Sequence, residues 1–490
     1  MKAYPKRPTG APEETIEVNE AVSSIAFAYE KLRHVIDYKE DHLFRLNAIE
    51  RFLNRIIFFK NYKENLAELL IRELIRSRYL KNKYIPVSQI QAVHQIVYKY
   101  WQILQKVDPK REEIGKWVVS LAACEIERQL VPQTREEALT QAFFQLLQPN
   151  VEAPKVPLFL AAYRALFRPA AATLRFHLIQ GYPPAFFEEH LDELKGEVEK
   201  WLNDSAGERL TRFCRHYTAP LLILNDVLNQ ISEPAELLDQ TKLEDLVTET
   251  CLGRYAQTRI SLRRKAVRSI LYIFITKMLF ALLLEIPVEI YLNGQIRRLP
   301  LVINSLFPPF LMFTYVLTVP RPDENNTLKI LAKIKEIVFQ GRLTTKRFVY
   351  TQAVKASGFR EKIFRYFFFF TFLLSFGLIV WGLAKIGFNL VSIMIFVFFL
   401  TLVSFFAYKV SQNAKDLIIE EKDGRFSLLT DLFMVPILKT GKRFSAELAK
   451  INVFNFILDF IIEAPFKTIL EIIEDWLGFL REKKEEIASS

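Results

Sequence analysis

Two long runs without a charged residue constrain the fold of this chain more than any other feature. The first lies between Arg365 and Lys385 and includes four consecutive phenylalanines, and the second runs from Phe388 to Tyr408. At about 1.5 Å per residue in an α-helix, each run is long enough to cross the roughly 30 Å hydrocarbon core of a bilayer. Because only a short link separates them, we expect an antiparallel pair of transmembrane helices over residues 363–408.

A second pair of apolar segments precedes these runs and is less clear. Residues 269–291 contain three charged residues, and residues 300–319 contain Pro308 and Pro309 at their middle. Since proline removes a backbone donor and clashes with the preceding turn, we expect a kink or a break there. A re-entrant pair shielded by protein is the alternative to two full spans. The sequence therefore predicts about four transmembrane helices, arranged as two hairpins.

Basic residues indicate how these hairpins are oriented. The stretch 254–268 contains basic residues and no acidic one, and the link 320–362 is also basic, whereas the hairpin tips contain few cations. The positive-inside rule then places both long flanks and both termini in the cytosol, as in a multi-pass protein of the cell membrane. The net charge of +11 lies beside the apolar runs, which indicates a lipid bilayer and no nucleic acid. The candidate membrane-surface residues are Arg259, Arg263, Arg264, Lys265 and Arg268.

Aromatic residues with a polar group lie near the expected ends of the spans. Such residues favour the boundary between lipid and water, where one end of the ring is apolar and the other is hydrated. The pattern is therefore typical of an aromatic belt, formed by Tyr272, Tyr291, Tyr366, Trp381 and Tyr408.

The N-terminal half has the pattern of a cytosolic helical domain. Its apolar residues recur at helical spacing, and no alternating strand pattern competes. Start signals of the capping-box type, with Glu or Gln three residues later, occur at Ser88, Thr134, Ser205 and Thr241. We expect roughly eight to ten helices over residues 15–253, packed as one bundle or a short array. Residues 1–14, rich in proline and charge, should form a disordered tail.

Two amphipathic segments follow the hairpins. The link 320–362 is expected to contain a helix with a stripe of Leu, Ile and Val, which either lies in the lipid headgroups or docks on the N-terminal domain. In the C-terminal region 409–490, residues 451–480 form an apolar helix with one narrow polar stripe, interrupted at Pro465. Its broad apolar face contacts lipid or, as we favour, packs against helices of this chain or of a second copy.

The sequence contains no recognisable catalytic, nucleotide-binding or cofactor signature. It has no P-loop, no strand-borne glycine-rich dinucleotide loop, no nucleophile elbow and no zinc-protease helix. The cluster around Glu188, Glu189 and His190 fits a solvated acidic face better than a metal site, because adjacent residues point to different sides of a helix. Three widely spaced cysteines predict reduced, buried thiols. We expect no enzyme, no cofactor and no metal.

Ionisable residues within an expected span form the strongest candidate site, because they are costly in lipid unless paired or hydrated. Glu285 and Glu289 share a helix face, and Asn304 should lie at the depth of Glu285 in an antiparallel hairpin. Lys277 lies about 80° around a regular helix from Glu285, so we expect no direct pair between them. These residues form a proton or cation site, or else Glu285 is simply hydrogen-bonded and Lys277 extends toward the cytosolic boundary.

These observations support three functional hypotheses. The leading one is a non-enzymatic membrane scaffold or adaptor that presents its cytosolic helical domain to a protein partner, and a homo-oligomer is the other assembly considered. The alternative is a small channel or a proton- or cation-coupled transporter that uses Lys277, Glu285 and Glu289. A membrane enzyme that acts on lipid ranks third.

Overall fold

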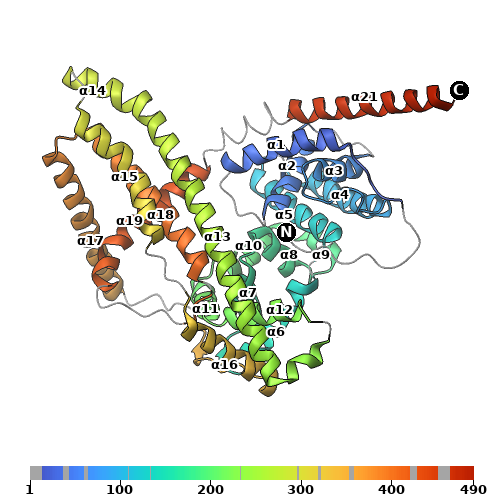
Figure 1. Ribbon diagram of the computed structural model, residues 1–490, viewed down its shortest axis with the longest axis horizontal. Coiled ribbons are helices and arrows are strands. Elements are labelled where there is room, and N and C mark those ends of the chain that lie inside the picture. The colour runs from blue at the N-terminus through green and yellow to red at the C-terminus, as the bar shows by residue number, and fades with distance from the viewer. Residues whose placement is uncertain are drawn as a thin grey trace. The chain divides into compact units, whose positions relative to one another are not determined.

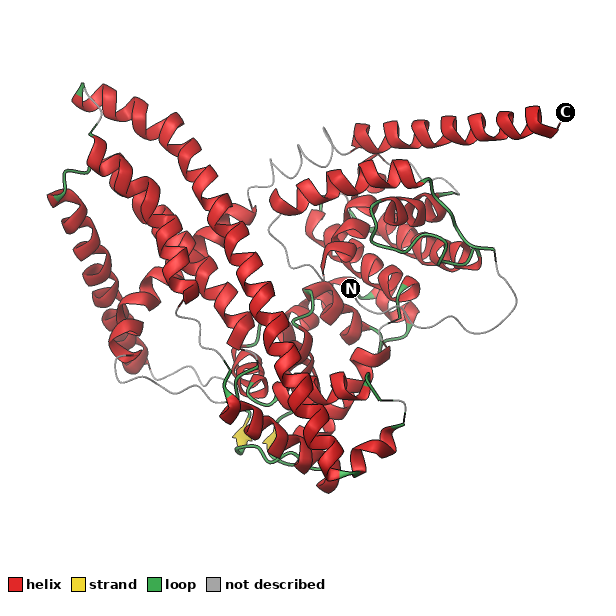
Figure 2. Ribbon diagram, viewed as in Figure 1, coloured by secondary structure: helices red, strands yellow, loops and turns green. Residues whose placement is uncertain are grey.

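In the described residues, the computed structural model contains helices and only two strands, each two residues long (Figure 2). This confirms the all-α class. The described residues are 14–36, 43–59, 65–108, 110–132, 134–231, 233–294, 297–317, 322–351, 358–415, 417–419, 427–450 and 464–489. The tail expected over residues 1–14 lies outside them, apart from Glu14.

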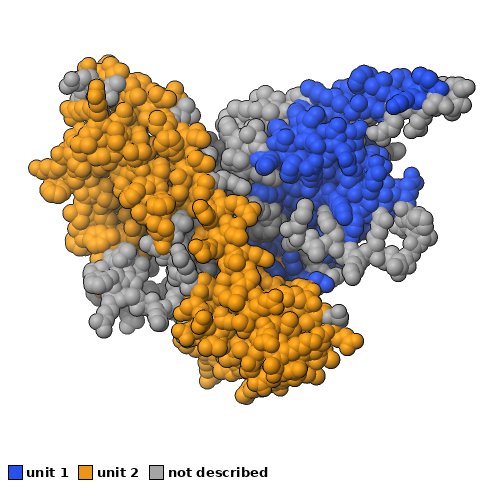
Figure 3. Space-filling model, viewed as in Figure 1, with its two compact units in different colours: residues 1–138, 167–204, 452–490 blue, residues 139–166, 205–451 orange. Residues whose placement is uncertain are grey.

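The chain forms two compact units (Figure 3). The first unit comprises residues 1–138, 167–204 and 452–490, and the second comprises residues 139–166 and 205–451. Residues 15–253, which we expected to form one helical domain, therefore contribute to both units. The expected domain end at residue 253 falls inside one continuous helix, α13 (Gln240–Phe280).

The core of the first unit surrounds helix α5, which is largely buried beyond its exposed first turn. This helix packs against α2, α4 and α8, and residues such as Val118, Leu121 and Ile126 are buried along its length. A helix with apolar residues on several faces needs neighbours on each of them. The helices of this unit are α1 (Glu20–Ile36), α2 (Phe44–Phe59), α3 (Leu66–Arg76), α4 (Ser88–Lys106), α5 (Glu112–Leu130), α8 (Ala171–Ile179), α9 (Pro184–Glu189), α10 (Leu191–Leu202) and α21 (Ala464–Ser489).

The second unit contains a helical layer joined to the link that follows the first hairpin. Helix α16 (Glu324–Gln340) buries Ile330 and Ile334 against apolar residues of α12 and α13. Of the two alternatives for this helix, docking on the helices of the N-terminal half is therefore confirmed. The other elements of this layer are α6 (Thr134–Leu147), β1 (Val151–Glu152), α7 (Lys155–Phe167), α11 (Ser205–Arg215), α12 (Thr218–Leu228), η2 (Pro234–Leu238) and β2 (Phe348–Val349), which pairs in parallel with β1.

The two expected hairpins are present and form a helical bundle (Figure 1). Helix α13 continues through a π-helical segment, η3 (Ala281–Glu285), into α14 (Ile286–Asn293), and α15 (Arg298–Leu317) packs back against α13. The second hairpin consists of α17 (Gly358–Lys385) and α18 (Leu390–Lys415).

A further helix, α19 (Ser427–Lys450), packs against both α17 and α18. The sequence contains only a short apolar stretch there, which includes Pro436, but the helix continues through that proline and through the basic residues after it. Gly441 permits the close crossing, because a Cβ atom at this position would overlap the backbone carbonyl of Thr401. The bundle therefore contains one more packed helix than the apolar runs indicated.

The structure supports fewer membrane spans than the sequence predicted. Among the described residues, Arg365–Lys385 and Leu390–Tyr408 are long and apolar enough to cross a membrane. The expected spans 269–291 and 300–319 are not among them, and residues 318–319 lie outside the described residues. Two of the four expected spans thus have support from length and composition.

Of the kink or break expected at Pro308 and Pro309, the break is wrong. Helix α15 continues through both prolines. A proline removes one helical hydrogen bond, but its backbone angle is compatible with a helix, and neighbouring helices can compensate for the lost bond inside a bundle. A re-entrant loop at this point is therefore not what the structure contains.

Candidate functional site

The candidate site lies in the hairpin bundle, where Lys277 and Glu285 form a fully buried ion pair. The Lys277 ammonium contacts Glu285 Oε1 directly, and neither side chain is exposed by more than 2%. The ammonium also lies 5.0 Å from the centre of the Phe399 ring, which provides a cation–π contact from α18. Our expectation that these two residues would not pair is wrong.

The π-helical segment η3 explains this pairing. Its hydrogen bonds join residues i and i+5, so this turn holds about one more residue than an α-helical turn. In a regular helix Glu285 would lie about 80° around the axis from Lys277. The extra residue in the wide turn reduces the rotation between them by about 100°, so both side chains lie on nearly the same side of the helix. Pro287, two residues beyond Glu285, lacks an N–H and crowds the carbonyl four residues before it. The proline was therefore the sequence signal for the widened turn.

Asn304 connects this ion pair to two other helices. Its Nδ2 donates to Glu285 Oε1 at 2.5 Å and to the backbone carbonyl of Ser392 at 3.3 Å. Asn304 is completely buried on α15, while Ser392 lies in the first turn of α18. The structure thus places Asn304 beside Glu285, as counting from the hairpin loop predicted. Its amide joins the two arms of the first hairpin to each other and to α18 of the second hairpin.

Glu289 lies nearer the tips of the hairpins and joins them. Asn389 donates its side-chain amide to Glu289, and Arg297 lies 3.7 Å from the same carboxylate. Arg297 also donates to the backbone carbonyl of Gly387 at 2.9 Å. Because Arg297 follows α14 and Gly387 precedes α18, these contacts hold the two hairpin tips together on one side of the bundle.

Two buried acceptors in the site have no hydrogen-bond donor among the described residues. They are Glu285 Oε2 and Asn304 Oδ1, the oxygens that the contacts above do not use. An unsatisfied buried acceptor is costly. Each of these two oxygens therefore favours a hydrogen-bond donor, such as water, or a small cation bound to it. The arrangement could therefore hold a water molecule, a proton or a small cation beside a neutral ion pair.

The structure adds residues that the sequence did not single out. Asn389, Arg297, Ser392 and Phe399 all contact the predicted set. Asn389 and Arg297 lie in or beside short hairpin loops, so their polar side chains and their positions were visible in the sequence. Ser392 contributes a backbone carbonyl and Phe399 a ring face, and neither contribution can be recognised from residue type.

The predicted membrane-surface residues lie along the middle of α13, on the N-terminal side of Lys277. Arg259, Arg263 and Arg264 are exposed, while the side chains of Lys265 and Arg268 lie outside the described residues. In the described part of the chain, no group of three or more His, Cys, Asp or Glu residues is arranged to hold a metal ion.

The three cysteines are free and buried, as the sequence predicted. Burial raises the pKa of Cys124 and Cys214 to about 12 and that of Cys251 to about 11. Thiols with such values are poor nucleophiles at neutral pH. Their positions give no indication of thiol chemistry.

Comparison of the chain with protein-family models, with curated proteins and with solved structures finds no match.

Proposed function

We propose that this chain is a non-enzymatic, multi-pass membrane scaffold that holds a helical domain at the cytosolic face of the membrane for a protein partner. The observation that carries this proposal is the reversed polarity of the hairpin bundle. Lys277, Glu285 and Asn304 are buried, whereas large apolar side chains such as Ile275, Leu283 and Phe310 are more than 60% exposed. Exposed apolar patches of this extent fit contact with lipid better than contact with water.

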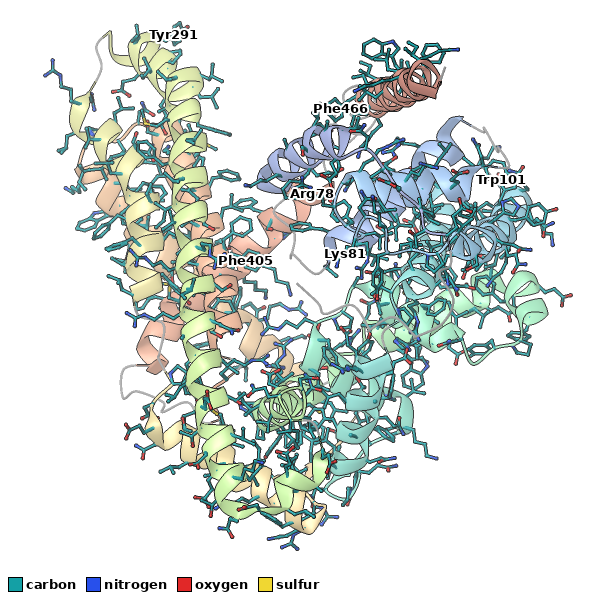
Figure 4. The ribbon with its side chains drawn as sticks, turned by 45° about the vertical axis from the view of Figure 1, so that its right-hand side comes forward. Arg78, Lys81, Trp101, Tyr291, Phe405 and Phe466 are labelled. Atoms are coloured by element: carbon teal, nitrogen blue, oxygen red, sulfur yellow. The ribbon has the colours of Figure 1, made fainter. Side chains whose placement is uncertain are left out.

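The distribution of exposed side chains supports four spans. The stretch Arg365–Lys385 is only 17% buried, unlike the core helix of a water-soluble protein. Helix α15 and the end of α13, which carry prolines or charges, also expose large apolar residues along their length. The three charges of the first hairpin face other helices of the bundle. Tyr291 at the end of α14 is exposed, as an interfacial aromatic residue would be (Figure 4).

The internal charges favour a structural role over transport. Lys277 neutralises Glu285, Glu289 has partners from two loops, and Asn304 joins three segments of the bundle. Each of these contacts holds segments of the bundle together. A bundle built in this way is suited to anchoring.

Cysteine labelling in sealed vesicles tests the topology. We expect Arg259→Cys to react from the cytosolic side, and Arg298→Cys and Lys385→Cys from the opposite side, because the three residues are exposed on α13 and at the two hairpin tips. The native thiols give little background, because burial raises their pKa to about 11 or 12. Labelling of all three positions from one side would contradict four spans, as would a chain that stays monomeric in buffer without detergent.

Co-sedimentation tests the scaffold role. Vesicles that contain the chain are mixed with cytosol, and the bound proteins are compared with those on vesicles that lack it. We expect at least one cytosolic protein to sediment only with the chain, and to remain soluble when the chain is absent. If the partner is recruited equally well when the chain is detached from the membrane, the anchoring part of the proposal is wrong.

A second function is favoured by one observation, namely the two buried acceptors without a donor, Glu285 Oε2 and Asn304 Oδ1. A channel or transporter for protons or small cations would use such oxygens as a transient site. Reconstituted vesicles should then show a proton or sodium flux that Glu285→Gln and Glu289→Gln reduce. A flux that neither substitution changes removes this alternative.

A further inference from the structure

A second buried charge cluster lies in the first unit, where the C-terminal helix α21 contacts α1. Lys467 of α21 lies 3.2 Å from Glu30 and 3.6 Å from Glu73, and it donates to Ser77 Oγ at 3.0 Å. Glu30 and Glu73 come from α1 and α3 and are almost completely buried. The two carboxylates repel each other, and the ammonium between them lowers that repulsion, so the position favours a cation.

Apolar contacts extend along the same side of α21. Leu470 is buried against Val22 and Ala26 of α1, and Ile473 and Leu477 pack beside it. The Phe466 ring lies 4.6 Å from the Tyr29 ring, at the end of α21 nearest the charge cluster (Figure 4). The residues that α21 contributes are thus an aromatic residue, a lysine directly after it, and apolar residues three, six and ten positions after the lysine.

The opposite side of α21 is apolar as well, but it remains exposed. Ile472 is 62% exposed, whereas Leu470 is 2% exposed, and three further large side chains lie on the exposed side, namely Ile469, Trp476 and Phe479. Docking on α1 therefore buries only part of the apolar surface of this helix. Because the contact with α1 covers only one side of α21, it is weaker than a contact that buries the whole helix, and it is therefore suited to exchange.

We propose that the face of α1 and α3 that α21 covers is a recognition groove for an amphipathic helix with the pattern aromatic–Lys–x–x–apolar–x–x–apolar, and that α21 is its resident, displaceable occupant. This inference rests on the proposed scaffold function and specifies the partner's chemistry. The buried carboxylates select the lysine, and the apolar strip along Val22 and Ala26 selects the residues that follow it.

The partner helix therefore gains access only when α21 leaves. A tethered helix acts at an effective concentration in the millimolar range, so α21 weakens the binding of any free helix by occupying the groove. Its departure leaves each carboxylate with one arginine, because Arg51 contacts Glu30 and Arg55 contacts Glu73. The empty groove is thus polar but not left with unpaired charges.

Peptide binding to the full chain in lipid nanodiscs tests the groove. The probe is a fluorescent peptide of residues 464–480, and the second chain carries Lys467→Ala and Leu470→Ala, which loosen its own α21. We expect the peptide to bind the loosened chain about tenfold or more tightly than the unmodified chain. Equal binding to both chains would overturn the proposal.

Two matched variant peptides distinguish binding in the groove from adsorption of the peptide to lipid. Leu470→Ala and Ile472→Ala remove similar apolar surface from opposite sides of the peptide, so their affinity for lipid falls equally. We expect only Leu470→Ala to reduce binding to the loosened chain, by about tenfold or more. Equal losses for the two peptides would overturn the groove.

Hydrogen exchange on the unmodified chain requires no variant. Excess peptide should accelerate exchange of α21 amides while α1 stays protected, and unchanged protection of α21 would also overturn the proposal. This result is independent of the co-sedimentation experiment, because peptide binding requires no cellular partner. The groove and the scaffold function can therefore fail separately.

Discussion

Lys277 and Lys467, the two lysines that are buried among the described residues, have similar partners and different surroundings. Lys467 in the first unit contacts Glu30, Glu73 and a serine, and each of those carboxylates has an arginine of its own. Lys277 in the hairpin bundle is the cation that contacts Glu285, and its other described neighbour is a phenyl ring. Loss of one partner from a buried ion pair is therefore tolerated better where further charges remain than where none does.

Removal of the hairpin lysine should have the largest effect. Lys277→Met leaves the Glu285 carboxylate buried without a counter-charge, and we expect a loss of about 3–5 kcal/mol in the free energy of unfolding. Denaturant titration of the chain in detergent measures it. Lys385→Met is the control, because Lys385 is exposed at a hairpin tip, and it should change stability by no more than about 0.5 kcal/mol. Similar losses in the two variants would contradict the comparison.

Removal of both charges should restore much of that stability. In Lys277→Met combined with Glu285→Gln, no unpaired charge remains, and the carbonyl of the introduced amide could still accept from Asn304. We expect the double variant to recover about 2 kcal/mol or more relative to Lys277→Met, and a double-mutant cycle measures the coupling. If the changes in the free energy of unfolding caused by Lys277→Met and Glu285→Gln alone add up to that of the double variant, the ion pair does not stabilise the bundle.

Removal of the lysine in the first unit should have a smaller and local effect. Lys467→Met leaves Glu30 with Arg51 and Glu73 with Arg55, so we expect a loss of about 1.5–3 kcal/mol, limited to docking of α21. Hydrogen exchange should show faster exchange in α21 and little change in α5. Lys484→Met, at an exposed position on the same helix, serves as the control. Global unfolding on loss of Lys467 would contradict the distinction.

The smallest effect should appear on acidification of the first unit. Burial alone would raise the pKa of Glu30, but Arg51, Lys467 and Tyr79 outweigh it and lower the pKa from 4.5 to about 2. Because the folded-state pKa is lowered, this carboxylate stabilises the contact above pH 4.5, and the stabilisation is lost as the pH falls from 4.5 to about 2.

Acid-dependent exchange of α21 measures this effect. The protection of its amides should fall in that window, after correction for intrinsic exchange, and should be constant above about pH 6. In Lys467→Met one of the charges that lower the pKa is absent, so the acid transition should shift to higher pH. A transition at the same pH in both proteins would show that Lys467 does not act on Glu30.

Local signals in the sequence predicted several elements well. Helices α4, α6 and α11 begin at Ser88, Thr134 and Ser205, as the start signals predicted, although the N-cap of α4 is Val87 and no side chain caps this helix. The fourth start signal, at Thr241, was displaced slightly, because the Asp239 side chain caps α13 instead. Such signals depend on neighbouring residues only, so a single sequence contains them.

The candidate site was predicted in part. Counting residues in an antiparallel hairpin placed Asn304 at the depth of Glu285, and the structure contains that hydrogen bond. Regular helix geometry failed for Lys277, because the π-helical turn before Pro287 changes the rotation between the two residues. The same kind of error affected α15, where two prolines are accommodated within a packed helix.

By itself, the sequence determined the helical class, the two uncharged runs of the second hairpin and the rarity of charges within the apolar segments, because these features follow from composition and short-range periodicity. Only the tertiary structure decided which charges meet. Lys467 and Glu30 are separated by more than 400 residues, and the hairpin tips are joined by contacts between separate loops. Such pairings depend on how helices pack around buried polar groups, and no local pattern encodes that packing.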